Sequence, residues 1–444
     1  MSKQDRRNAR AARTARMDEH GPWYRLDNAA IIMPAVSTRR GTSFFRIAMD
    51  LDHPVRLDYL DLALERIAPR FPFFMVELKR GLFWYYFQPR RVPLHAESDL
   101  GPPCMGVSVR KQGAALLRVR SRDAVLACEF SHLLTDGYGG LTFFKALLVE
   151  YFKAQGLESS AENIGIDLSA PPRQEEFEDA YQRFYRPGLP LPDPQPRVFH
   201  IPSEFLPHQR YRILSGELAV DELKAAAKAH GGSVTEFLAA IYFESLIKLR
   251  EALPPRKLER ANPRISLEIP VNMRQFFPTC TLRNFSLFLL PRLDTRLGPW
   301  TLDELVRFVH HYMAIENDPR RIAREIGRNA GGGRKLVVRL IPLFVKNFFA
   351  RILFDALGEG LISGILSNLG LIQLPPEIAR HVLGMEFAGA PSAALKTHAL
   401  MGSFNGKTCI SFGSLARSSD LERLFFSRLA GFCPGLRVRS NTEV

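Results

Sequence analysis

The sequence is poor in cysteine, because its 444 residues include only five, scattered singly and never in a CxxC pair. This pattern argues against a disulfide framework and against a structural zinc site. A chain without disulfides fits a reducing compartment, so we predict a cytoplasmic protein that holds no metal. The five thiols are Cys104, Cys128, Cys280, Cys409 and Cys433.

Long apolar runs are also missing, and no stretch reaches the eighteen uncharged residues that a transmembrane helix requires. The nearest candidate is residues 336–358, which four charged residues interrupt: Arg339, Lys346, Arg351 and Asp355. We predict an amphipathic helix pair around Pro342, either packed in the core or lying against lipid. The second alternative would add peripheral contact with the inner face of the membrane.

Acidic residues are outnumbered, since 46 Asp and Glu against 60 Lys and Arg give a net charge of +14. A surface of this sign attracts phosphorylated cofactors, anionic lipid or an acidic protein. Nucleic acid is not predicted as a partner, because no aromatic-basic motif accompanies the charge. Residues 1–19 are Arg-rich but no apolar segment follows them, so we expect a disordered basic tail rather than a secretory signal.

Proline marks the main boundary of the chain. Residues 186–207 contain seven prolines, which cannot continue a helix or a central strand, so we expect an extended crossover linker. The linker separates an N-terminal half, residues 20–185, from a C-terminal half, residues 208–444. Strand-like and helix-like patterns alternate in both halves, which predicts a mixed α/β (α+β) fold.

The segment ACEFSHLLTDGYGGLTFFKALL, residues 127–148, has the most distinctive pattern. It predicts a strand that ends at His132, a turn, and a helix that begins near Gly139 or Gly140. A histidine at a strand end can point its imidazole into a cavity, and its ordinary pKa near 6.5 suits proton abstraction. Asp136 would orient that ring or pair with a distant cation. Gly137 would allow a backbone conformation that a side chain would obstruct.

The sequence contains a second copy of this spacing, in His95 and Asp99. That copy has no apolar strand before it and no glycine after it, so we interpret it as chance and His95 as a surface residue. A GxSxG serine motif and a dinucleotide-binding glycine loop are both missing. Covalent serine catalysis and dinucleotide binding are therefore not expected.

HLLTDGYGG resembles the HxxxDG signature of the acyl-CoA-dependent acyltransferase superfamily, which includes chloramphenicol acetyltransferase and the condensation domains of peptide synthetases. The residues that follow are most similar to bacterial alcohol O-acetyltransferases. Further landmarks, DELKAAAKAHGGSVTEFLAA, PVNMR, RNFSLF and SNLG, extend the resemblance over about residues 20–430. The resemblance implies two chloramphenicol-acetyltransferase-like subdomains, each a mixed sheet with flanking helices, and an active-site tunnel between them.

The resemblance also assigns roles at the motif. His132 would be the general base that takes a proton from the acceptor. Asp136 and Gly137 would be structural, and Asp136 would pair with Arg274 of PVNMR.

Three further residues are placed near the tunnel by the resemblance. Asn284 of RNF would lie beside it, and Ser367 and Asn368 of SNLG would lie on the strand that crosses between the halves. They would either stabilise an oxyanion or only satisfy backbone groups.

The implied function is acyl transfer from acyl-CoA, a co-substrate, to a small alcohol, an amine or a lipid acceptor. No permanently bound cofactor is implied. An acyl carrier protein is an alternative donor, so carrier-dependent condensation remains open, as do lipid acyl transfer and a catalytically silent binding protein. Ser131 stands where condensation domains usually have a second histidine, which favours the coenzyme A donor.

Overall fold

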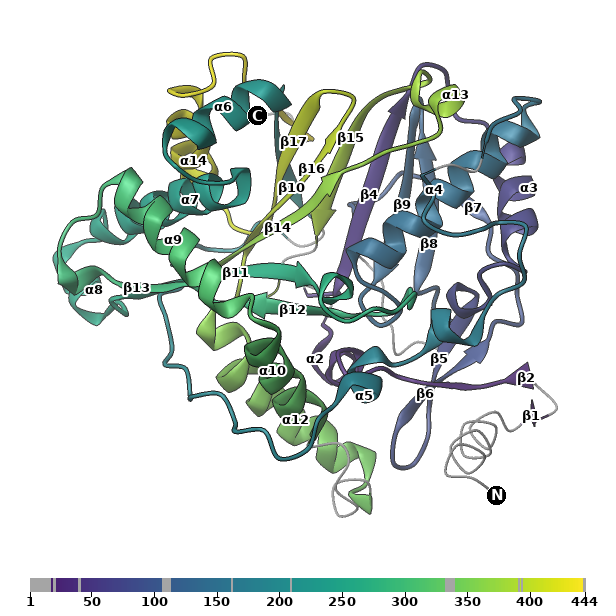
Figure 1. Ribbon diagram of the computed structural model, residues 1–444, viewed down its shortest axis with the longest axis horizontal. Helices are drawn as coiled ribbons and strands as arrows, with labels where there is room; N and C mark the ends of the chain where they lie inside the picture. Colours follow the sequence, from purple (N-terminus) through teal and green to yellow (C-terminus); the bar gives the residue numbers. More distant parts are fainter. Residues whose placement is uncertain are drawn as a thin grey trace.

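The computed structural model describes residues 17–441 except 19–20, 39–40, 106–112, 161–162, 208–209, 332–339, 390–391 and 393. Two large sheets with helices packed against them make up the described chain (Figure 1). Of the predicted tail, Met17–Asp18 form strand β1, which pairs with β2, Gly21–Pro22. The remainder of residues 1–19 lies outside the described residues.

The smaller of the two large sheets has five strands in the order β15-β4-β9-β8-β7. They comprise Val382–Gly389 (β15), Phe44–Leu51 (β4), Val125–Ser131 (β9), Leu117–Arg122 (β8) and Ala96–Ser98 (β7). Helices α3 (Leu57–Ile67) and α4 (Gly137–Ala154) pack together and bury their apolar faces in the core beneath this sheet. A three-stranded sheet completes this part of the chain, with β3 (Tyr24–Arg25), β6 (Tyr85–Pro89) and β5 (Val76–Arg80).

The larger sheet has eight strands, in the order β12-β11-β14-β16-β17-β10-β18, and β13 also pairs with β11. They comprise Ser286–Leu289 (β12), Arg264–Asn272 (β11), Gly364–Leu371 (β14), Thr397–Phe404 (β16), Lys407–Ser414 (β17), Arg212–Ala219 (β10), Arg437–Ser440 (β18) and Arg292–Asp294 (β13). Helices that share its core are α6 (Val220–Ala229), α7 (Val234–Glu251), α9 (Leu302–Glu316) and α14 (Asp420–Ala430). Ser233 and Glu236 form a capping box at the start of α7.

One strand of the C-terminal half belongs to the N-terminal sheet. Strand β15 pairs antiparallel with β4 over nearly its whole length, and the two lie side by side in Figure 1. The expectation that Ser367 and Asn368 lie on the crossing strand is therefore wrong. Their strand, β14, pairs with β11 and β16 and stays in the larger sheet.

The remaining segments connect these layers. Within the proline-rich residues 186–207, the only strand-like pairing is the single bridge between Phe205 and Ala416. Short helices are α2 (Met33–Val36), α5 (Ala180–Phe184), α8 (Pro255–Arg260) and α13 (Pro376–Ala379), with α10 at Pro319–Gly331.

Helix α12, Leu343–Leu357, begins directly after Pro342, as the proline predicts. The preceding part of the predicted helix pair, residues 336–339, lies outside the described residues. No helix within the described ranges combines the length and apolar character needed to cross a bilayer.

Candidate active site

His132 directly follows strand β9 and is held through its backbone from two sides. Its N–H donates to the carbonyl of Ser43, 2.8 Å away, and its own carbonyl accepts from Asn284 Nδ2 at 2.8 Å. The preceding residues Phe130 and Ser131 are fully buried. The backbone of His132 is therefore held by β9, by the residue before β4 and by a residue of the C-terminal half.

The surroundings of the His132 ring favour its neutral form. Burial lowers its pKa from the ordinary value of 6.5, while the charge of Asp136 and hydrogen bonds to Asn284 and the Thr135 backbone oppose that shift. The ring of Phe45 lies 4.7 Å from the imidazole between centroids. A neutral imidazole at pH 7 can accept a proton, which is what a general base must do.

Asp136 is a structural residue in this geometry. It is the N-cap of α4, where its carboxylate accepts from the backbone N–H of Gly139 at 3.1 Å. The same carboxylate accepts from Phe285 N at 2.8 Å and from Arg274 Nη1 at 2.9 Å. The Asp136–Arg274 ion pair is almost fully buried and joins the two halves of the chain.

All three nitrogen atoms of the Arg274 guanidinium donate hydrogen bonds where the two halves of the chain meet. Its Nε donates to Thr281 O at 2.9 Å, and its Nη2 donates to Arg283 O at 2.6 Å. The guanidinium also lies over the ring of Tyr138, 4.5 Å from its centroid. The structure therefore brings Asp136 and Arg274 together as the resemblance implied.

Helix α4 begins at Gly137, earlier than the expected start near Gly139 or Gly140. Gly137 does not have a positive φ, so the expectation of a special backbone conformation is wrong. Its lack of a side chain matters for packing instead, since a Cβ there would lie 2.7 Å from Leu369 Cδ2. The glycine leaves room for the end of the Leu369 side chain, which extends from β14.

Asn284 belongs to a buried network that the sequence pattern did not reveal. Its Nδ2 donates to Asp27 Oδ2 at 3.1 Å as well as to the His132 carbonyl, so both of its N–H groups are engaged. Burial raises the pKa of Asp27, and an ion pair with Arg283 at 3.4 Å opposes that shift. Asp27 and Asn284 are 257 residues apart, so no local spacing signals their contact.

The side chains of Ser367 and Asn368 lie on opposite faces of strand β14. Alternation along β14 places Ser367 opposite Leu400 of β16, whose side chain packs into the N-terminal core. Asn368 belongs to the other face, where its Nδ2 donates to Thr235 Oγ1 of α7 at 3.1 Å. None of the hydrogen bonds found among the described residues joins either side chain to His132.

A second imidazole, His398, lies close enough to His132 that the charge of His132 affects the pKa of His398. Burial, with a smaller contribution from the charge of His132, lowers the pKa of His398 to about 3. His398 is on β16, on the same face as Leu400, and its Nε2 is buried without a hydrogen-bond partner in the described part of the chain. The sequence analysis missed this residue, because only the alternation in THALMGSF shows which face it occupies.

Solved structures match this fold, although no protein-family model and no curated protein matches the sequence. TRI101 of F. graminearum, solved with coenzyme A and T-2 mycotoxin, has a TM-score of 0.59 at 11% identity, over 94% of this chain and 99% of that one. Polyketide synthase associated protein 5 from Mycobacterium tuberculosis gives 0.56 at 15% identity, over 87% and 93%. The condensation domain of the Monacolin K polyketide synthase MokA gives 0.53 at 11% identity, over 92% and 96%.

The chain has the chloramphenicol-acetyltransferase-like, condensation-domain-like acyltransferase fold. The predicted fold class is confirmed. Identities of 11–15% establish the fold alone, so the reaction has to be argued from the site.

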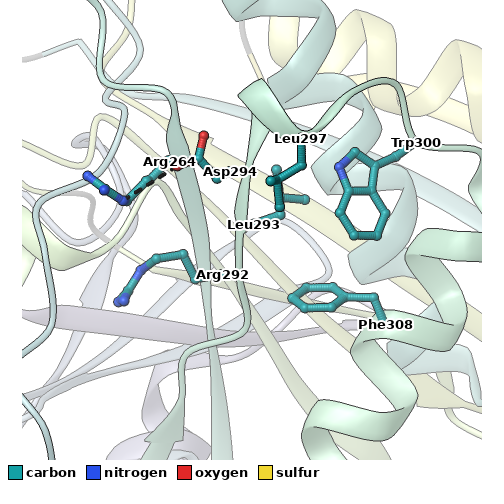
Figure 2. A pocket seen from close by; sticks show the side chains of 7 residues that line it. All are labelled: Arg264, Arg292, Leu293, Asp294, Leu297, Trp300 and Phe308. Atoms are coloured by element: carbon teal, nitrogen blue, oxygen red, sulfur yellow. Dashed lines mark ion pairs between the residues drawn. The ribbon is translucent and has the colours of Figure 1, made fainter.

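Two cavities among the described residues lie at the edge of the larger sheet. One, of about 230 Å³, is lined by Arg264, Arg292, Leu293, Asp294, Leu297, Trp300 and Phe308. Figure 2 shows its two arginines on one side of the strand and its two aromatic rings on the other. The other cavity lies between β12 and α10. Neither is lined by a residue of the HxxxDG segment.

One group of potential metal ligands occurs among the described residues, away from the motif. Asp52, His53 and His381 place their ligand atoms within 4.8 Å of one another. The Asp52 carboxylate contacts His53 Nδ1 at 2.6 Å and His381 Nδ1 at 2.8 Å. These contacts join the end of β4 to the residue before β15, so they tie the crossing strand in place.

Proposed function

We propose that this protein is an acyltransferase in which His132 acts as general base for direct transfer from a coenzyme A thioester to a hydroxyl group. The observation that carries the proposal is the backbone-anchored imidazole at the junction of the two sheets, in surroundings whose burial lowers its pKa. A positioned base contributes about 10²–10⁴-fold to such a reaction. The fold of the TRI101 structure with coenzyme A supports this class of donor.

In the proposed reaction, His132 takes the proton of the acceptor hydroxyl as its oxygen attacks the thioester carbonyl. The tetrahedral intermediate then collapses, the carbon–sulfur bond breaks, and the imidazolium returns the proton to the departing thiolate. The new bond is an ester, and no group on the enzyme is acylated. Asn284 would position His132 by donating to the backbone carbonyl of His132. Its N–H groups are engaged with that carbonyl and with Asp27, so they would not serve an oxyanion.

The donor could instead be an acyl group on a carrier protein. The condensation domain of MokA has the same fold, and the net charge of +14 favours an acidic carrier protein as much as the phosphates of coenzyme A. Both donors would use the same imidazole. An amine acceptor would also follow the same steps and give an amide.

The test measures free thiol while purified protein is incubated with acyl-CoA of several chain lengths and a panel of alcohols and amines. We expect thiol release that depends on the acceptor, and a decrease of about 10²–10⁴-fold in kcat for His132→Ala. His95→Ala is the matched control, since His95 repeats the HxxxD spacing and its side chain is 65% exposed. Release only from an acylated carrier protein would identify the alternative donor, and an unchanged kcat for His132→Ala would exclude this base.

A further inference from the structure

Three elements expose large apolar side chains next to one another. They are the segment from residue 340 to residue 352, which includes most of helix α12, the 3₁₀ turn η1 (Ala30–Ile32), and the turn between β5 and β6. We term this surface the apolar face. Its eight side chains are each 50–72% exposed: Ile31, Leu82, Trp84, Leu340, Phe344, Phe348, Phe349 and Ile352. So many large apolar groups together are unusual on the surface of a monomer and mark an interaction site.

Hydrogen bonds hold the three elements as one surface. Leu343 N donates to Leu82 O at 2.9 Å, and Lys346 Nζ donates to Phe83 O at 2.9 Å. Farther along α12, Arg351 Nε donates to Ala35 O of α2, also at 2.9 Å, and α2 directly follows η1. Helix α12 therefore lies against both other elements, as Figure 1 also shows.

The charged residues among the exposed apolar positions are basic, up to Ile352 of α12; the helix also contains Asp355, one turn farther on. Arg80 and Arg351 are exposed, and Lys346 is half-buried. Residues 30–36, 80–85 and 343–352 contain no acidic side chain. Aromatic rings flanked by Lys and Arg, without acids, are typical of surfaces that enter the headgroup region of a membrane.

The apolar face also adjoins the candidate site. Ala30 of η1 donates its N–H to Asp27 Oδ1 at 2.9 Å. Asp27 in turn accepts from Asn284, which holds the carbonyl of His132. A surface bound through η1 would therefore lie near the proposed base.

We propose that the apolar face docks on a bilayer that contains anionic phospholipid. The net charge of +14 and the basic groups on the face complement such a lipid surface. A second copy of the chain is the less favourable occupant, because a two-fold contact would bring the same cations of both copies together. The docking itself does not depend on catalysis, whereas a lipid acceptor delivered from the bilayer would rest on the proposed function.

The test is flotation of the full chain with vesicles of phosphatidylcholine, with and without phosphatidylglycerol. We expect flotation with the anionic vesicles that weakens at high salt. The triple variant F344S/F348S/F349S should lower the partition coefficient about tenfold or more, since it removes three side chains that enter the interface. The matched control is L100S/L191S/L297S, which removes three exposed leucines elsewhere and should float like the wild type.

A second readout uses Trp84, whose emission should shift to the blue on vesicle binding and whose replacement by Phe should remove the shift. His132→Ala should float like the wild type, which separates membrane docking from catalysis. Equal flotation of F344S/F348S/F349S and the wild type would overturn the proposal. So would the failure of the wild type to float, or a dimer in solution that the triple variant abolishes.

Discussion

The imidazole of His132 lies at a strand end beside the aromatic ring of Phe45, and its charge affects the pKa of a second imidazole on β16. Its chemistry depends on this setting, because an exposed histidine would be partly protonated near pH 6.5. Burial shifts the balance toward the neutral ring. The nearby charge of Asp136 limits the shift without acting on the substrate, since its carboxylate is engaged by backbone and by Arg274.

The lowered pKa of His132 gives a pH dependence with a definite sign. Because only the neutral ring accepts a proton, kcat/KM should be constant at neutral pH and fall as acid protonates the ring. The midpoint should lie below the ordinary value of 6.5, since burial favours the neutral form. Thiol release measured from pH 4.5 to pH 8 would check this expectation. A midpoint above pH 7 would contradict the assignment.

The buried ion pair between Asp136 and Arg274 should dominate the stability of the junction. We expect Asp136→Asn to lower the free energy of unfolding by about 3–5 kcal/mol, because it leaves a buried guanidinium without its counter-charge. Arg274→Lys should be destabilising too, since lysine cannot donate to Thr281 and Arg283 simultaneously. Urea unfolding measures both.

The control for the ion pair is Asp318→Asn, which breaks a pair whose arginine side chain, Arg320, is 90% exposed. An exposed pair contributes about 1 kcal/mol or less, so this variant should unfold like the wild type. Equal losses for Asp318→Asn and Asp136→Asn would show that burial is not the cause.

At the scale of elements, the start of helix α4 is packed too closely for side chains. A Cβ on Gly139 would collide with the carbonyl oxygen of Leu282 and the hydroxyl of Thr135. That hydroxyl donates to the Leu282 carbonyl at 2.6 Å, so the helix start and the β11–β12 connection are in direct contact. This contact positions the Asp136 cap and the His132 turn together.

We therefore expect Gly139→Ala to lower the free energy of unfolding by about 1–3 kcal/mol through overpacking. Gly327→Ala is the matched control, because Gly327 lies within α10 and its nearest neighbour, Arg186 O, is 3.9 Å from the added Cβ. That variant should gain about 0.5–1 kcal/mol from helix propensity. Thermal or urea unfolding of both would test the contrast, and a neutral Gly139→Ala would refute the close contact.

For helix α12, the periodicity of the sequence predicted an apolar face but not what would cover that face. The pattern of residues 336–358 left core packing and a lipid-facing helix open as alternatives. The described part exposes Phe344, Phe348 and Phe349, so this face of the helix is not packed in the core. Periodicity gives the faces of a helix, whereas neighbouring elements determine which face remains uncovered.

At the scale of the whole molecule, strand β15 makes the two halves interdependent. It covers the edge of β4, and Met385 and Phe387 of this strand pack into the N-terminal core. The boundaries predicted from the proline-rich linker therefore divide the sequence into halves, whereas the five-stranded sheet combines strands from both halves. A cut at the linker would uncover a strand edge and part of a core.

We expect residues 20–185 expressed alone to aggregate, or to bind a hydrophobic dye without a cooperative unfolding transition. Co-expression with residues 186–444 should restore a folded complex, because it returns β15 to the edge of β4. Gel filtration and urea unfolding measure the two cases. A monomeric fragment 20–185 with a sharp transition would contradict this interdependence.

The strand, turn and helix around His132 were predictable from local sequence, since they depend on contacts between residues a few positions apart, such as the cap from Asp136 to Gly139. The alternating strand and helix patterns predicted the mixed fold, and the family resemblance predicted the Asp136–Arg274 pairing. Only tertiary contacts set the partial burial of His132, its anchor on Asn284, the contact of Asn284 with Asp27, the approach of His398 and the crossing of β15. Each of these depends on residues far apart in the chain, whose contacts arise only when the sheets pair and pack.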